Sequence, residues 1–280
     1  MMHRRIDLPS AVTCGGCHRR QFREWSQSLH HRAWTNANAR AATNEFTIEK
    51  CRPCHSPMSV FEQGLQSAPD YRDFNQEDGV HCLSCHGLKD GVAARHTRED
   101  APCRPKYSEG LVSADLCFPC HEPTHQAFTE YRTSKAYRDG RRCADCHMPI
   151  LEDGISRSHG PHGGLNPEFI AGAFDSHMEW TDRSVAVRLR NLTGHKLPGE
   201  IPSRSLVIKV DIDGGEALYE TLRRPHKEEV REDNRLQPDE ERTITFQAPE
   251  GTSIRSVQIL WKPYPLMADS QAYVLATSSR

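Results

Sequence analysis

Apolar and polar residues alternate in the last third of the chain, in runs rich in β-branched side chains. Alternation with a period of two is typical of strands that bury one face. Turn signals separate the runs, an Asp-Gly-Gly run at 213–215 and a Gln-Pro-Asp run at 237–239. Several short strands at this spacing predict a small β-sandwich of immunoglobulin-like type over residues 179–280. The predicted strands cover residues 184–191, 205–212, 242–247 and 256–261.

The first two-thirds of the chain have a different pattern. Phe22, Trp25, Leu29 and Ala33 recur at helical spacing, which predicts a helix within residues 18–42. Residues 56–80 are rich in Gly, Pro, Asp and Gln and are predicted to form loops, as are residues 87–116. The sequence therefore predicts an α+β protein, with a mainly α-helical and loop domain over residues 1–178 before the β domain.

Cysteine is concentrated in that first domain. Ten of the 11 cysteines form five Cys-x-x-Cys pairs, and a histidine follows each pair directly. This is the attachment pattern of haem c, in which the two thiols bond to the macrocycle and the adjacent histidine binds the iron as proximal ligand. We therefore predict five covalently attached haem c groups. The attaching cysteines are Cys14, Cys17, Cys51, Cys54, Cys82, Cys85, Cys117, Cys120, Cys143 and Cys146, and the proximal ligands are His18, His55, His86, His121 and His147.

Zinc sites and disulfides are the two alternative uses of these cysteines. Cys-x-x-Cys pairs also build zinc ribbons, but a zinc site does not require histidine after the second cysteine. A disulfide framework makes no such demand either, and it is typical of shorter chains. Histidine after all five pairs therefore favours haem.

The composition fits this reading. Hydrophobic residues make up 36% of the 280 residues, which is lean for a chain of this size. Five haems, each a large and mostly apolar body, would supply the missing core, so we expect the first two-thirds to be largely unfolded without them. The motifs recur without a fixed period between Cys14 and His147, so neighbouring haems must share walls in one cluster.

Charge and hydropathy narrow the setting. Lys and Arg are spread along the chain, which disfavours nucleic-acid binding. The chain has no run of about 20 apolar residues, so we predict no membrane span in it. The first ten residues lack the apolar core of a signal peptide, yet haem c is attached outside the cytoplasm. We therefore expect a periplasmic or extracellular protein whose signal was removed or whose start codon is misassigned. Cys103 is left over, as an inert thiol, a link to a partner chain or the remnant of a lost motif.

The sixth iron ligands would come from other histidines. Sixteen histidines less five proximal ones leave eleven, enough to give each iron a second histidine and hence a low potential. The run from Cys14 to Ala33, with Trp25-Ser-Gln-Ser-Leu-His30-His31-Arg-Ala33, resembles the first motif of a multihaem cytochrome superfamily. This superfamily includes the tetrahaem cytochrome of ammonia oxidisers and hydroxylamine oxidoreductase. Its motif, W-x-x-S-x-H-x-x-A, implies that His30 is a distal ligand, with His31 as the fallback.

The fifth haem motif resembles the same superfamily. Met and Pro follow His147, as in C-x-x-C-H-M-P, which in that group precedes S-H-x-F-x-G-G. Here Ser158-His159-Gly-Pro-His162-Gly-Gly occupies that place, so the aromatic residue is replaced by histidine. The resemblance implies His159 as a distal ligand, with His162 as the alternative, and Met148 as a packing residue.

A third run resembles N-x-x-x-G-H-x-x-P-T-G-x-P-x-R and lies in the β domain. It runs from Asn191 to Arg204 and lacks the threonine, because Gly199 follows Pro198 directly. The resemblance implies that His195 reaches back to a haem as a distal ligand. For the middle haems the candidates are His96, then His81, then His125.

Two functions fit five haems. If every iron has two protein ligands, the chain is an electron carrier whose potential is set by ligands and burial. If one haem keeps an open face, the chain is an oxidoreductase acting on a small nitrogen or sulfur compound. All five motifs end in histidine, and none has the C-x-x-C-K form that marks the catalytic haem of pentahaem nitrite reductases. We therefore expect a carrier. Its partners would be other cytochromes or a membrane quinone-linked complex, and the sequence is compatible with an oligomer.

Overall fold

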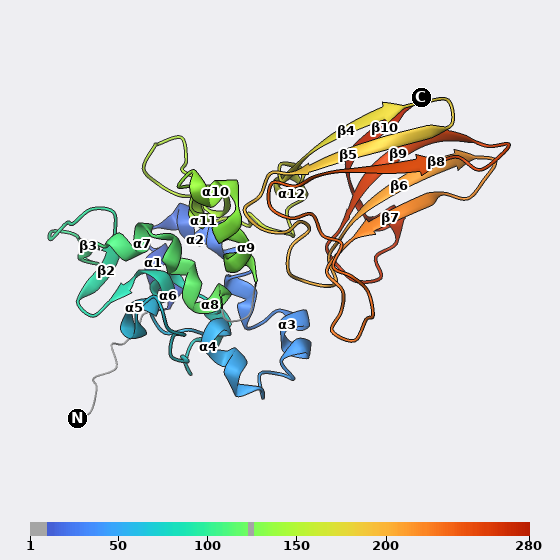
Figure 1. The fold of residues 1–280 in the computed structure, drawn as a ribbon. Helices are drawn as coiled ribbons and strands as arrows, with labels where there is room; N and C mark the ends of the chain where they lie inside the picture. Colours follow the sequence, from blue (N-terminus) through green and yellow to red (C-terminus); the bar gives the residue numbers. More distant parts are fainter. Residues whose placement is uncertain (1–9, 123–125) are drawn as a thin grey trace. The chain divides into compact units, whose positions relative to one another are not determined.

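The computed structural model describes residues 10–122 and 126–280, and the chain divides into two compact units (Figure 1). The N-terminal unit comprises residues 1–124 and 142–162, and the C-terminal unit comprises residues 125–141 and 163–280. The C-terminal unit thus includes residues on both sides of the predicted boundary at residue 178. In the described ranges no helix is long and apolar enough to cross a membrane.

Short helices build the N-terminal unit. Its longest described α-helix has eight residues, and helices this short are marginal in water unless they pack on something. The α-helices are α1 (Ala11–Gly15), α2 (Arg19–Ser26), α3 (Ala37–Ala42), α4 (Arg52–His55), α5 (Val60–Gln63), α6 (Cys82–His86), α7 (Glu109–Val112), α8 (Phe118–His121) and α11 (Cys143–His147). Single 3-10 turns cover His31–Ala33, Glu49–Cys51, Gln76–Asp78 and Ala114–Cys117.

The helix predicted within residues 18–42 is interrupted. α2 ends at Ser26, a 3-10 turn covers His31–Ala33, and α3 begins after Asn36, whose side chain caps it. The interruption has a tertiary cause, because the carbonyl of His30 accepts a hydrogen bond from the Val80 backbone N–H at 2.9 Å. The apolar stripe holds only over α2, where Trp25 is buried, whereas Leu29 is exposed.

Part of the predicted loop at 87–116 forms a small sheet. Strand β1 (Gly87–Leu88) pairs antiparallel with β2 (Gly91–Ala94), which pairs parallel with β3 (Pro105–Tyr107). The strands have two to four residues, too few for alternation to be visible in the sequence.

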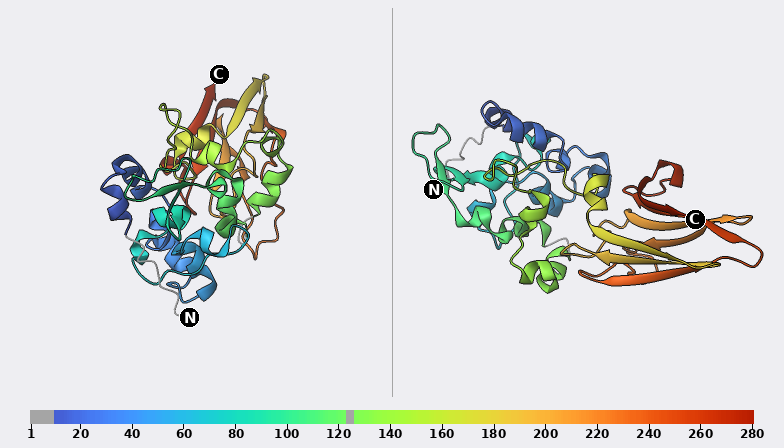
Figure 2. Two further views of the ribbon diagram at one scale, coloured as in Figure 1. Left: turned by 90° about the vertical axis from the view of Figure 1, so that its left-hand side faces the viewer. Right: turned by 90° about the horizontal axis from the view of Figure 1, so that it is seen from above.

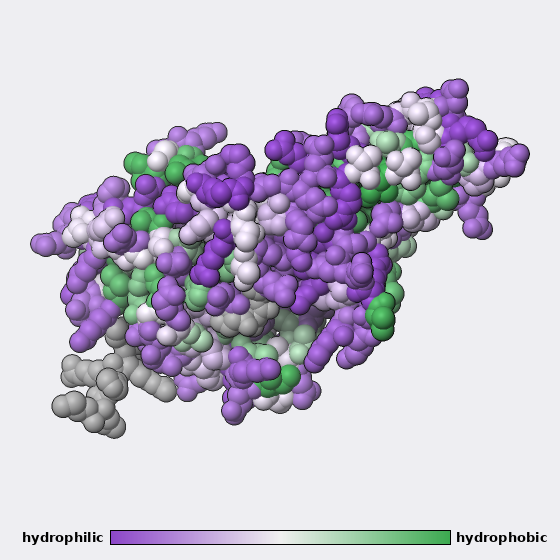
Figure 3. All heavy atoms as spheres, viewed as in Figure 1, coloured by the Kyte–Doolittle hydropathy of each residue, from purple (hydrophilic) through white to green (hydrophobic). Residues whose placement is uncertain are grey.

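The N-terminal unit has few buried apolar side chains. Those in its described part are Ala11, Trp25, Phe46, Val60, Leu83 and Ala93, whereas the other buried hydrophobic residues belong to the C-terminal unit. Figure 3 shows hydrophobic residues exposed among hydrophilic ones on the visible face of this unit. The protein alone therefore supplies little hydrophobic stabilisation here.

Two antiparallel sheets form most of the C-terminal unit (Figures 1 and 2). One has the order β10-β9-β6-β7 and the other the order β4-β5-β8. The strands are β4 (Phe174–Trp180), β5 (Ser184–Asn191), β6 (Ser205–Asp213), β7 (Leu218–Leu222), β8 (Glu241–Gln247), β9 (Ser253–Lys262) and β10 (Tyr273–Ser279). The unit also holds the α-helices α9 (Ala127–Thr133), α10 (Lys135–Arg138) and α12 (Pro167–Ala171), and a 3-10 turn at Asp269–Gln271.

The four predicted strands correspond to β5, β6, β8 and β9. Alternation places Val185, Val187 and Leu189 of β5 in one core cluster with residues of β6 and β9, so the two sheets share a single hydrophobic core. Strands β4, β7 and β10 were not predicted from the sequence. β4 is mostly exposed and polar, so it has no apolar period to detect.

Candidate functional site

The five Cys-x-x-Cys-His motifs all lie in the N-terminal unit, each on a short helical turn. Cysteines three positions apart on a helical turn face the same side. In α4, α6, α8 and α11 the histidine is the last helical residue, and His18 stands between α1 and α2. Proline in the first turn of α4 and α8 favours starting the helix there. Each motif thus presents two thiols and an imidazole from one turn.

Three of the proximal histidines are oriented by backbone carbonyls. Nδ1 lies 2.7 Å from the Ala33 oxygen for His55, 2.8 Å from the Ala93 oxygen for His86, and 2.8 Å from the His162 oxygen for His147. In a neutral imidazole this contact makes Nδ1 the donor and leaves the Nε2 lone pair for a metal. The acceptors are carbonyl oxygens, so no side-chain signal in the sequence could have identified them.

Two proximal histidines face a predicted distal histidine. The ring centroids of His30 and His121 are 6.2 Å apart, and those of His86 and His159 are 6.3 Å apart. A metal bonded to one nitrogen of each ring at about 2 Å, with about 1.1 Å from nitrogen to centroid, separates the centroids by roughly 6.2 Å. Both centroid separations therefore match that of two imidazoles bound to one iron.

The surroundings keep these imidazoles neutral. Burial lowers the pKa of His30, and the nearby His147 and His159 lower it further. Burial also lowers the pKa of His86 and of His159. A neutral imidazole is the form that binds a metal, so no proton has to be displaced at neutral pH.

Thiols from different motifs lie next to one another. Hydrogen bonds join Cys14 with Cys82, Cys54 with Cys120, and Cys117 with Cys143. The bond to Cys82 lowers the pKa of the free Cys14 thiol to about 7, and burial raises that of Cys85 to about 11. The first motif is therefore a neighbour of the third, the second of the fourth, and the fourth of the fifth.

His159 and the alternative His162 differ in their contacts. The His159 backbone N–H donates to Glu24 at 2.8 Å, and its Nδ1 lies 3.0 Å from the Arg157 oxygen. Nε2 of His162 lies 2.8 Å from the Ser158 hydroxyl. The metal-binding nitrogen of His162 is thus engaged by a side chain, whereas the ring of His159 faces His86.

His195 lies in the C-terminal unit on a firmly held turn. Asn191 donates to the His195 carbonyl at 2.8 Å, and Nδ1 of His195 lies 3.1 Å from the Lys196 oxygen. Burial lowers the pKa of His195. The turn thus holds the His195 imidazole in one orientation through its Nδ1.

The remaining candidates are placed differently. His81 is buried and caps α6, where its Nδ1 accepts the Ser84 backbone N–H at 3.1 Å. Its Nε2 is buried without a hydrogen-bond partner among the described residues. His96 lies between β2 and β3 and is exposed. The proximal histidine His18 is also exposed. His125 lies outside the described residues.

Two further sequence features have plain placements. His31, the fallback for His30, packs its ring against Trp25 with 4.4 Å between centroids. Cys103 is exposed and lies outside the motifs.

Asp145 ties the fifth motif to its surroundings. It accepts the Arg142 backbone N–H at 2.8 Å and pairs with Arg157 at 2.7 Å. Burial alone would raise the pKa of Asp145, but these bonds outweigh it and lower the pKa to about 2. The ionised carboxylate therefore stabilises the folded state.

Asp145→Asn is expected to lower the free energy of unfolding at pH 7 by about 1–2 kcal/mol, allowing for the partial exposure of the carboxylate. A depressed folded-state pKa stabilises above the unfolded value of about 3.9 and loses that effect as pH falls toward the folded value. The difference from wild type in denaturant melts should thus shrink between about pH 4 and about pH 2. The exposed Asp100→Asn is the control, and a difference that persists at pH 2 would contradict this account.

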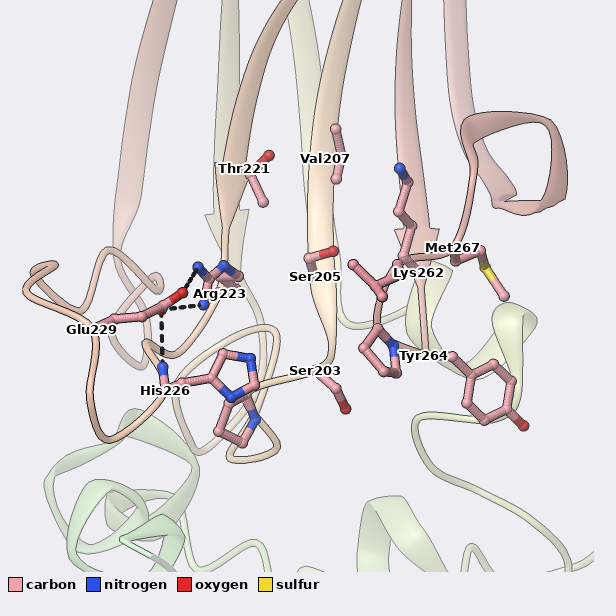
Figure 4. Close-up of a pocket in the computed structure, with 13 residues that line it drawn as sticks. Ser203, Ser205, Val207, Thr221, Arg223, His226, Glu229, Lys262, Tyr264 and Met267 are labelled. Carbon is pink, nitrogen blue, oxygen red and sulfur yellow. Dashed lines mark hydrogen bonds and ion pairs between the residues drawn. The ribbon is translucent and has the colours of Figure 1, made fainter. Parts of the chain in front are cut away.

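A separate hollow lies in the C-terminal unit and has a volume of about 340 Å³. Figure 4 shows Arg223 facing Glu229 on one side and Lys262 with Tyr264 on the other. Its charges are paired, Arg223 with Glu229 at 2.7 Å and Lys262 with Asp269 at 2.6 Å. It contains none of the Cys-x-x-Cys-His residues, so the candidate site is the cluster of these motifs in the N-terminal unit.

The comparisons with known proteins agree with this location. A model of the family described as cytochrome c554 and c-prime matches residues 13–87. Among solved structures, a penta-heme cytochrome c552 from Thermochromatium tepidum is similar, with a TM-score of 0.70 and 19% sequence identity over 97% of this chain and 98% of that chain. No curated protein matches the chain. At this identity the structural likeness establishes the fold alone.

Proposed function

We propose that this chain is a pentahaem c-type cytochrome that transfers electrons through closely spaced haems outside the cytoplasm. One observation carries the proposal. The ring of His30 lies opposite His121, and the ring of His159 lies opposite His86, each pair at the centroid separation that a shared iron requires. The cytochrome c554 family match and the similarity to a penta-heme cytochrome support five covalently bound haem c groups.

The proposed ligands follow from the contacts. Five cysteine pairs attach the haems and the histidine after each pair is the proximal ligand, as the sequence predicts. His30 serves the fourth motif and His159 the third. His195 and His96 remain candidates for other irons, whereas we assign His81 to capping α6 because its Nδ1 accepts a hydrogen bond.

Each haem, when bound, takes up or releases one electron at its iron. Carbonyl contacts at Nδ1 fix the orientation of His55, His86 and His147. Burial lowers the pKa of His30, His86 and His159 and so favours their neutral form. The thiol contacts support neighbouring haems at the first and third motifs, and at the fourth motif with the second and the fifth.

The C-terminal unit supports a narrower proposal about its fold. We infer an immunoglobulin-like sandwich, because one sheet of three strands and one of four share a core and have the orders β4-β5-β8 and β10-β9-β6-β7. The partners of the whole protein in electron transfer would be other cytochromes or a membrane quinone-linked complex.

Low-temperature EPR and potentiometric titration of the holo-protein test the proposal. We expect low-spin signals from the oxidised haems and five overlapping reduction steps over a broad, mostly negative range, because two histidines favour low potential. A persistent high-spin signal that shifts with nitrite or hydroxylamine would instead support an oxidoreductase with one open haem.

A further inference from the structure

One arginine organises the loop between the second and third motifs. Arg72 is fully buried, and its guanidinium donates to the backbone carbonyls of Pro57, Phe74, Asn75 and Gly79. The bond to Gly79 is 2.7 Å long. Arginine is suited to this role because its planar fork offers five donors and stays charged even when buried.

The end of this loop docks on the turn that carries His30. The Val80 backbone N–H donates to the His30 carbonyl at 2.9 Å, and Trp25 Nε1 donates to the Val80 carbonyl at 2.8 Å. Gly79 has a φ of +56°, and a Cβ there would lie 2.4 Å from the His30 oxygen and 2.5 Å from the His31 oxygen. The contact is therefore backbone on backbone, and only glycine permits it.

The same turn serves two motifs. At its start, the ring of His30 faces His121 of the fourth motif at 6.2 Å. At its end, the Ala33 carbonyl is the 2.7 Å partner of Nδ1 of His55 in the second motif. A shift of this turn would move one ligand and weaken the hydrogen bond that orients another.

We propose that Arg72 is a positioning residue for the iron ligands of the second and fourth motifs, acting through Gly79 and Val80 on the turn from His30 to Ala33. The inference rests on the proposed function, since it takes His30 and His55 to be iron ligands. Arg72 itself touches neither imidazole in the contacts described. It fixes the carbonyl of Gly79 and so the position from which Val80 holds the turn.

The test uses the full holo-protein and begins with His30→Ala, followed by Arg72→Lys and Gly79→Ala. His30→Ala should convert one haem to high spin. Arg72→Lys should raise the high-spin fraction at that haem and shift the reduction potential of a second haem. The reason is that the lysine ammonium lacks the planar set of donors with which the guanidinium binds four converging carbonyls. Added imidazole should restore low spin in His30→Ala and in Arg72→Lys. It should not return the shifted second reduction potential of Arg72→Lys to its wild-type value.

Val60→Ala is the matched control, because Val60 is buried in the same unit and should lower the melting temperature without changing the spin state. If Arg72→Lys fails to mature, Gly79→Ala tests the same contact and should give the same spectral change. A low-spin spectrum and unchanged potentials in both Arg72→Lys and Gly79→Ala, with His30→Ala high-spin, would overturn the role of Arg72 alone. A fully low-spin His30→Ala protein would overturn the ligand assignment and this inference together.

Discussion

Replacing both thiols of the third motif, Cys82→Ser with Cys85→Ser, is expected to remove one haem and to abolish cooperative folding of the N-terminal unit. This unit buries few apolar side chains in its described part, and its helices are too short to be stable alone. A fully buried apolar side chain contributes about 1.5–3 kcal/mol, and a haem replaces several such side chains. The decrease in the free energy of unfolding would thus approach the whole stability of a domain, which is roughly 5–15 kcal/mol.

Mass spectrometry gives the haem count of this variant, and circular dichroism with thermal melting gives its folding. Cys103→Ser is the matched control, since Cys103 is exposed and outside the motifs. That variant should keep five haems and the wild-type melting curve. A variant that lacks this one haem and whose N-terminal unit still melts cooperatively would contradict the claim that the haem is part of its core.

The parts of the fold that the sequence predicts are those set by local pattern. β5 was found because a strand that buries one face must alternate, and its inward side chains are almost fully buried. The edge strand β10 was missed because its residues are half-exposed and carry no clear period. The helix predicted over residues 18–42 failed at His30, where a bond from Val80 fixes a turn instead. A contact across 50 residues leaves no trace in local spacing.

The same distinction holds for the candidate site. The attaching cysteines and proximal histidines are adjacent in sequence, so their chemistry is visible there. The facing of His30 and His121 joins residues 91 positions apart, and only the fold reveals it. The cap that His81 forms on α6 was also hidden, because the partner of its Nδ1 is not visible in the sequence.

His159→Ala is expected to open one haem to exogenous ligands. Its ring faces His86 at 6.3 Å, so alanine would leave the iron of the third motif with one protein ligand. The EPR spectrum should gain a high-spin signal and lose about one fifth of its low-spin intensity, since one of five haems changes. The midpoint potential of that haem should rise, because a basic ligand that favours the oxidised iron is lost.

His162→Ala provides the matched control three residues away. Its ring bonds to Ser158, and its contribution to His147 is a backbone carbonyl that alanine keeps. This variant should therefore stay low-spin. Imidazole should restore low spin to His159→Ala, because the site would still be shaped for a ring opposite His86. The reverse result, with His162→Ala high-spin and His159→Ala unchanged, would assign the ligand to His162 and would mean that the ring pairing at His86 has another cause.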